Sequence, residues 1–349
     1  MTTVYLHVGF PKCASTTVQS FFHRNDGLHR SKGVCYPKSY RDKSGYFSHR
    51  PLLNLGESDF DAAVGEIAAE AKENDCDKVF LSSEQFLKHL WESDFLASLI
   101  AALNRRFGTE NVRLITLVRN QVGFVESAYA QFLRAPILRV HAKTFFRAKD
   151  TSIKGFMDHF REMNGFDFFS YADIFDMFRE KIPGNPLEVY SIERDDLDGQ
   201  DIIVFLSEML GLPAPTKAEP RNERFSDQAL LMLRYAMSRR GERIEPRRRR
   251  MIKRLFADMS GGFSPVLHLT GEPLERVVES SKRDDGYLKS NFSTEFGSLL
   301  EKSLAATSGR ARKQKLKVGP KHRALTDYVV FADAPTLKNA ERVKAELGL

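Results

Sequence analysis

Short apolar runs alternate along the chain with segments in which apolar residues recur every three or four positions. The apolar runs, which predict buried strands, cover residues 4–10, 77–82, 111–118 and 186–192. A helical pattern follows each of them. Strands that alternate with helices in this way are typical of an α/β domain. The pattern therefore predicts a mainly parallel central sheet flanked by helices.

The remaining segments divide into further helices and one long polar stretch. Helices are expected at residues 61–74, 120–133, 201–210 and 273–298, and from Ser226 onward. Residues 24–56 are polar and rich in Gly, Pro, Ser and Tyr. Long loops in compact domains are often functional, but exposure alone also explains a polar composition. This stretch is therefore either a flap over a site or an ordinary exposed excursion.

The pattern also predicts how the chain is divided. Residues 1–304 are expected to form one domain, and residues 305–349 a basic linker with a short C-terminal extension. Residues 305–323 are rich in Arg and Lys with almost no apolar content, which predicts a mobile linker. A strand at 328–331 and an amphipathic helix from Pro335 complete the chain. This extension could dock on the domain or on a second subunit.

The first strand leads into a loop with the features of a phosphate cradle. Residues 9–17, Gly-Phe-Pro-Lys-Cys-Ala-Ser-Thr-Thr, join that strand to the first helix. Loop N–H groups and the positive end of the helix dipole would face one point, and Lys12 adds a full charge. Thr16 and Thr17 can donate hydrogen bonds to anionic oxygens. The loop is not a Walker A motif, because no glycine precedes Lys12 directly.

Residues 9–17 resemble the 5′-phosphosulfate loop of sulfotransferases that use 3′-phosphoadenylyl sulfate (PAPS), whose pattern is roughly G-x-P-K-[TCS]-[GA]-[ST]-[ST]. Residues 117–129, Leu-Val-Arg-Asn-Gln-Val-Gly-Phe-Val-Glu-Ser-Ala-Tyr, are similar to the segment of that family in which an arginine and a serine hold the 3′-phosphate. Here Arg119 ends a predicted strand and Ser127 lies two turns into the next helix. A looser resemblance extends over residues 3–300.

The resemblance implies a P-loop-like sulfotransferase fold and a sulfotransferase activity. A sulfuryl group would pass from PAPS to an acceptor hydroxyl, on a cell-surface glycan or glycolipid, leaving 3′,5′-ADP. Lys12 would act in catalysis by stabilising charge on the leaving phosphate. The residues implied in PAPS binding are Lys12, Cys13, Ala14, Ser15, Thr16, Thr17, Arg119 and Ser127. No metal is implied.

Glu84 is the candidate general base for the acceptor hydroxyl. It follows the predicted strand at 77–82, and Ser82-Ser83-Glu84 is similar to an S-x-E segment of bacterial sulfotransferases. A carboxylate here could instead support the N-terminus of the next helix. His7 and His23 are weaker candidates for the base, because one lies inside a strand and the other is expected on a helix surface.

Composition narrows the class of protein without identifying its activity. The 349 residues are 42% hydrophobic and 28% charged, as in soluble globular proteins. No signal-peptide pattern and no membrane-length apolar run are present, so we expect a cytoplasmic protein, with peripheral association at the inner membrane as an alternative. Cys13, Cys35 and Cys76 lack metal spacing and fit a reducing compartment. Cys13 either fills space in the loop or is a thiolate activated by the helix dipole.

The charge distribution keeps two other classes of function open. The formal net charge is +7, and Arg and Lys gather between Arg239 and Arg254. That run is either a solvated helix face or a surface for an acidic glycan, a nucleotide or lipid head groups. It motivates one alternative, a basic nucleic-acid-binding protein without catalysis. The other alternative is a P-loop-like nucleotide kinase, which the missing Gly-Lys-Ser/Thr sequence disfavours.

Overall fold

The computed structural model describes residues 1–213, 225–257, 262–292, 297–310 and 315–349. Within it the chain divides into two compact units, each drawn from separate parts of the sequence. The first unit comprises Met1–Asn120, Tyr171–Asn222 and Lys282–Leu299. The second comprises Gln121–Ser170, Glu223–Ser281 and Leu300–Leu349. Each unit is described by itself below.

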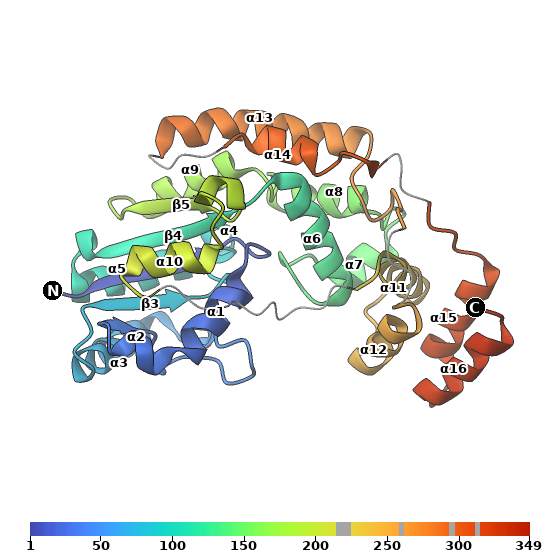
Figure 1. Cartoon of the computed structure of the whole chain (residues 1–349), viewed down its shortest axis with the longest axis horizontal. Helices are drawn as coiled ribbons and strands as arrows, with labels where there is room; N and C mark the ends of the chain where they lie inside the picture. The colour runs from blue at the N-terminus through green and yellow to red at the C-terminus, as the bar shows by residue number, and fades with distance from the viewer. Residues whose placement is uncertain (214–224, 258–261, 293–296, 311–314) are drawn as a thin grey trace. The chain divides into compact units, whose positions relative to one another are not determined.

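The first unit is built on a parallel sheet with the strand order β2-β3-β1-β4-β5. Figure 1 labels three of these strands, β3, β4 and β5. The strands are β1 (Thr3–Gly9), β2 (Val34–Cys35), β3 (Lys78–Ser82), β4 (Val112–Val118) and β5 (Leu187–Ser191). In the register, Leu6 of β1 lies opposite Leu81 of β3 and Leu114 of β4. β1 is central and almost wholly buried, as its continuous apolar run requires.

The predicted α/β class and parallel sheet are confirmed. β1, β3, β4 and β5 coincide with the four apolar runs. β2 was not predicted, because two residues at a sheet edge leave no pattern that distinguishes them from a loop. The strand predicted at 328–331 is wrong, since these residues close a helix. A short apolar run fits a strand and a buried helix equally well, and Val329 and Val330 are buried in the helix.

Helices flank the sheet of the first unit (Figure 1). They are α1 (Ser15–Arg24), α2 (Asp26–Arg30), α3 (Phe60–Glu73), α4 (His89–Glu92), α5 (Phe95–Phe107), α9 (Tyr171–Lys181) and α10 (Ile202–Leu210). Short 3₁₀ helices occupy Arg50–Asn54, Glu57–Asp59, Thr109–Asn111 and Arg194–Leu197. α10 begins at Asp201, whose carboxylate accepts from the N–H of Ile203, and ends at Gly211 with φ 73°, as the sequence predicts.

The described part of the second unit consists mainly of helices, with an isolated parallel β-bridge between Phe263 and Lys315. Its helices are α6 (Gln121–Arg134), α7 (Ala142–Arg147), α8 (Ile153–Asn164), α11 (Asp227–Arg240), α12 (Pro246–Leu255), α15 (Pro320–Phe331) and α16 (Leu337–Glu346). α13 (Glu272–Asn291) and α14 (Leu299–Ala305) have residues in both units. Phe132, Phe145, Phe156 and Phe168 are buried and meet edge to face or tilted, so the aromatic residues here form core.

The C-terminal extension packs on α11 and α12 of its own chain. Nη1 of Arg248 on α12 donates to the carbonyls of Val329, Val330 and Ala332 at the end of α15, at 2.7–3.0 Å. Nζ of Lys344 on α16 donates to the carbonyl of Leu255 at the end of α12, at 2.6 Å. Each cation thus satisfies the last carbonyls of a neighbouring helix. The division predicted at residue 304 stays a prediction.

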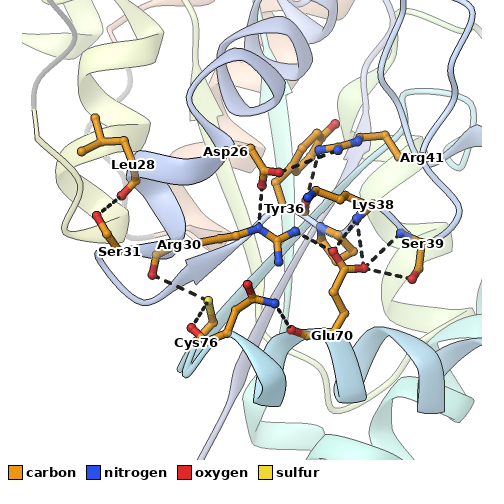
Figure 2. Close-up of polar contacts among 12 residues, drawn as sticks. Asp26, Leu28, Arg30, Ser31, Tyr36, Lys38, Ser39, Arg41, Glu70 and Cys76 are labelled. Carbon is orange, nitrogen blue, oxygen red and sulfur yellow. Dashed lines mark hydrogen bonds and ion pairs between the residues drawn. The ribbon is translucent and has the colours of Figure 1, made fainter.

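The carboxylate of Glu70 on α3 binds several groups of the stretch 24–56 (Figure 2). Glu70 accepts from the guanidinium of Arg30 and from the backbone N–H groups of Lys38 and Ser39, all within 3.0 Å. Arg30 also bonds Asp26 at 2.9 Å. Burial alone would raise the pKa of Glu70, but the Lys38 N–H and Arg30 outweigh it and lower that pKa to about 2. The stretch is therefore held in place at the side of the sheet.

None of the helices among the described residues has the length and the apolar character that crossing a bilayer requires.

Candidate functional site

Most of the predicted site residues of the first unit follow β1 and β4, the two neighbouring strands between which the order of the sheet changes direction. From β1 the chain passes to β2 and β3 on one side, and from β4 it passes to β5 on the other. The loops that follow the neighbouring strands β1 and β4 therefore lead to opposite sides of the sheet. In open parallel sheets, ligands bind beyond the carboxyl ends of the strands at such a point. Lys12 follows β1, and Arg119 follows β4.

The loop after β1 has an unusual backbone. Gly9, Lys12 and Ala14 have φ angles of 142°, 68° and 62°, in the region that favours glycine. A Cβ on Gly9 would lie 3.0 Å from Cβ of Leu87 and 3.5 Å from the carbonyl oxygen of Glu84. Gly9 thus lets the Glu84 segment lie directly against the loop. Positive φ at two non-glycine residues is a cost that folded proteins accept mostly at binding and catalytic sites.

The loop ends at the N-terminus of α1, as the sequence predicts. Ala14, the N-cap residue, accepts from the N–H groups of Thr17 and Val18 at 2.9 and 3.1 Å. Because the Thr17 N–H is engaged in this turn, Thr17 would offer a ligand its hydroxyl. Thr16 and Thr17 are half-buried, whereas Ser15 is only 4% exposed. The first N–H groups of a helix have no intrahelical acceptor, and the dipole favours an anion there.

Cys13 is fully buried in this loop. Burial raises the pKa of its thiol to about 12, although the positive charges of Arg119 and Lys12 act in the opposite direction. A protonated, buried thiol is a poor nucleophile. The structure therefore favours the interpretation of Cys13 as a residue that fills space in the loop.

Arg119 lies against the loop after β1. Its Nη1 donates to the carbonyl of Lys12 at 3.4 Å. Its backbone is fixed by Tyr171, whose hydroxyl donates to the Arg119 carbonyl at 2.7 Å. Nε of Arg119 is buried and has no hydrogen-bond partner among the described residues. A buried guanidinium N–H without an acceptor is costly, and an anionic oxygen would remove that cost.

Tyr171, Asn120 and Glu193 support the site, although the sequence analysis did not assign them to it. The fully buried Tyr171 holds Arg119, and its ring meets that of Phe10 edge to face, with the ring centroids 4.9 Å apart. Glu193, which follows β5, accepts from Asn120 through both the backbone N–H and the side-chain amide, at 3.0 and 2.7 Å. The position of Glu193 after a strand end was visible in the sequence, but Tyr171 was indistinguishable from core.

Glu84 stands at the edge of the sheet, two residues after β3. Its Oε2 accepts from Nε2 of the buried Gln19 at 2.9 Å. The same amide nitrogen lies 3.2 Å from Oγ of Ser82, which lies 2.8 Å from Nδ1 of His7. A hydrogen-bonded network therefore connects His7 of β1 and Ser82 of β3, through Gln19, to the half-buried carboxylate of Glu84. No sequence signal marked Gln19, because a single glutamine on a helix carries no pattern.

The structure bears on the alternatives to Glu84 as a base. α4 begins at His89, so Glu84 precedes its first turn by several residues and does not support that helix N-terminus. His7 is fully buried, and burial lowers its pKa to about 4, so it is neutral and shielded. His23 is half-buried on α1, and its ring stacks on Phe47 with centroids 3.6 Å apart. Glu84 is the one of the three that lies beside the loop.

Ser127 belongs to the second unit, where it is half-buried on α6. It lies two helical turns beyond Arg119, as the sequence predicts, because α6 starts at Gln121. The first unit thus brings together Lys12, residues 13–17, Glu84 and Arg119. The partnership of Arg119 with Ser127 stays a prediction.

The described residues contain no group of His, Cys, Asp or Glu side chains arranged to hold a metal ion. No family model, curated protein or solved structure matches the chain. Any inference about the chemistry of the site is therefore drawn from the residues that form it.

Proposed function

We propose that the protein is a PAPS-dependent sulfotransferase with a P-loop-like sulfotransferase fold. The observation that carries the proposal is the contact of the Arg119 guanidinium with the carbonyl of Lys12. It joins two segments that resemble the 5′-phosphosulfate and 3′-phosphate segments of the family. In the proposal, the side chains of Lys12 and Arg119 and the N-terminus of α1 would face one bound nucleotide. Such an arrangement suits a nucleotide with phosphate groups at both the 5′ and the 3′ position.

The residues present fit this nucleotide. Lys12, the hydroxyls of Ser15, Thr16 and Thr17, and the first N–H groups of α1 would hold the 5′-phosphosulfate. Arg119, whose buried Nε lacks an acceptor among the described residues, would hold the 3′-phosphate together with Ser127. PAPS, when bound, supplies the sulfuryl group. Lys12 would neutralise the charge that develops on the departing phosphate, a role of electrostatic stabilisation.

Glu84 would take the proton of the acceptor hydroxyl. Its backbone carbonyl lies against Gly9 of the loop, and its carboxylate accepts a hydrogen bond from the amide of Gln19. The hydrogen bond engages one carboxylate oxygen and leaves the other able to accept the proton of an acceptor hydroxyl. The acceptor that we propose is a hydroxyl group of a cell-surface carbohydrate or glycolipid.

Calorimetric titration without magnesium tests the nucleotide part of the proposal. The protein should bind 3′,5′-ADP tightly and 5′-AMP weakly, because only the first carries a 3′-phosphate. Arg119→Ala should weaken 3′,5′-ADP binding by about 2–5 kcal/mol, the range for removing one partner of a desolvated charge pair. Arg105→Ala is the matched control, since Arg105 is exposed and pairs with Asp61 on the surface. Equal affinities for the two nucleotides would exclude a 3′-phosphate site and with it the proposed function.

A further inference from the structure

Several cations of the basic run from Arg239 to Arg254 are engaged in contacts that support the fold. The guanidinium of Arg239 lies over the ring of Phe331 at 5.7 Å. Arg240 pairs with Glu242 at 2.9 Å, and Arg248 caps α15. These cations hold the second unit together, so only part of the run is a candidate for binding a ligand.

A second group of cations converges around two phenylalanine rings. Arg134, the last residue of α6, and Lys253 of α12 lie over the same ring, that of Phe225, at 4.7 and 5.5 Å. Arg249 lies one turn before Lys253 on the same face of α12. We call Arg134, Arg243, Arg249 and Lys253 the basic cluster. It draws on α6, on α12 and on the turn between α11 and α12.

Arg243 is the most firmly held member of the basic cluster. Its Nη1 donates to the carbonyl of Phe132 at 2.6 Å, and its guanidinium lies 4.8 Å from the Phe132 ring centroid. Its Nη2 and the Nε of Arg249 are buried and have no hydrogen-bond partner among the described residues. Both side chains are half-buried, so these donors are withheld from bulk water as well. Such donors are rare in folded proteins, where bound water, ions or ligands satisfy most of them.

The members of the cluster also repel one another. Burial lowers the pKa of Arg243 to about 10, with a further contribution from the charge of Arg249. Burial, and then the charges of Arg134 and Arg250, lower the pKa of Arg249. No carboxylate in the described part of the chain pairs with Arg243 or Arg249. Like charges brought together without a counter-charge reduce stability, and a bound anion would reverse this.

We propose that the basic cluster binds a compact ligand with two or more phosphate or sulfate groups. Guanidinium groups bind such oxyanions through paired hydrogen bonds. Because the basic cluster contains several cations, it could bind two or more anionic groups of one ligand. An extended nucleic acid or a lipid surface would instead use the exposed Arg247, Arg250 and Arg254. The half-buried cations around Phe132 and Phe225 favour the compact ligand. This site is separate from the proposed PAPS site and does not depend on it.

Binding of inorganic pyrophosphate to the full chain tests this proposal. The parent protein for the experiment carries Lys12→Ala and Arg119→Ala, which removes the proposed nucleotide site. Pyrophosphate should raise the melting temperature of this parent. Adding Arg249→Gln should weaken pyrophosphate binding at least tenfold, and it should raise the melting temperature without ligand because a repulsion is relieved. Arg254→Gln, which removes the same charge from an exposed position of the same helix, should leave binding unchanged.

Several outcomes would overturn the proposal. One is that pyrophosphate does not bind the parent. Another is that Arg249→Gln and Arg254→Gln weaken binding equally, which would mean a general effect of charge. A third is that duplex DNA or vesicles of anionic phospholipid bind more tightly than pyrophosphate and lose affinity with Arg254→Gln. That result would identify the exposed face of α12 as a surface for an extended polyanion.

Discussion

Lys12 combines a charge with a backbone conformation that is costly for a side chain with a Cβ. It is half-buried with φ 68°, in a loop held by Gly9, Cys13 and the contact with Arg119. Its side chain contributes a charge at the site and little to the core. Its replacement should therefore affect chemistry far more than folding.

Lys12→Ala is expected to lower kcat of the proposed sulfuryl transfer by about 10²-fold or more, the range for losing one group that stabilises transition-state charge. The melting temperature should stay close to that of the wild type. Activity and thermal unfolding of Lys12→Ala and of Lys32→Ala, an exposed lysine of the same unit, check this together. A large fall in melting temperature for Lys12→Ala alone would show that the lysine is structural.

Gln19 acts on the proposed reaction through Glu84, so we regard it as a positioning residue. Gln19→Leu removes the hydrogen bond to Glu84 while keeping the side chain's approximate size. A hydrogen bond to a charged group contributes about 1.5–3 kcal/mol, so kcat should fall by roughly 10- to 100-fold. KM for the acceptor should change little, and the acidic limb of the pH profile of kcat should shift. An unchanged pH profile together with a lowered melting temperature would indicate that Gln19 only packs.

At the scale of elements, Glu70 joins α3 to the stretch 24–56. Its pKa of about 2 lies below the ordinary value of 4.5. A lowered pKa contributes stability that is present above pH 4.5 and is lost as the pH falls toward 2. The difference corresponds to about 3 kcal/mol, as an order of magnitude for this carboxylate that is 14% exposed.

Glu70→Gln should therefore destabilise the protein by up to about 3 kcal/mol at pH 7 and by progressively less below pH 4.5. Urea unfolding at pH 7 and at pH 3.5 measures this. Glu73→Gln, at an exposed position in the last turn of α3, is the control of equal charge change. Equal effects of Glu70→Gln and Glu73→Gln would show that Glu70 does not anchor the stretch.

At the scale of the whole second unit, His268 joins segments that are distant in sequence. Its Nδ1 lies 3.0 Å from Glu126 of α6, and its Nε2 lies 2.8 Å from Asp227 of α11. Glu126 also pairs with Arg310 at 2.6 Å, in the segment predicted to be a linker. Burial opposes the charge of His268, but Asp227 and Glu126 outweigh burial and raise its pKa to about 9.

A raised pKa contributes stability that is fully present below pH 6.5 and is lost as the pH rises through 9. His268→Gln should therefore lower stability by about 3 kcal/mol at pH 6. The difference from the wild type should shrink between pH 6.5 and pH 9. Thermal unfolding of both proteins across this range checks the prediction, and a difference independent of pH would show that the imidazolium charge is not what stabilises the unit.

The sequence by itself determined the features that depend on local pattern. Apolar periodicity revealed β1, β3, β4 and β5 and helices such as α1, α3, α6 and α10, because strands and helices bury side chains at different repeats. The order of Gly9, Lys12 and the Ser-Thr-Thr run marked the loop before α1 as a candidate phosphate cradle. The positions of Glu84 and Arg119 at strand ends followed from the same pattern.

Only the tertiary structure decided which of these strand ends are neighbours. β1 lies between β3 and β4, and this pairing of distant segments brings Glu84 and Arg119 to the loop of Lys12. The tertiary structure also revealed the hydrogen bond from Gln19 to Glu84, the helix at 328–331 and the packing of the C-terminal extension on α11 and α12. Such contacts join residues far apart in the chain, and the local spacing of apolar residues carries no information about them.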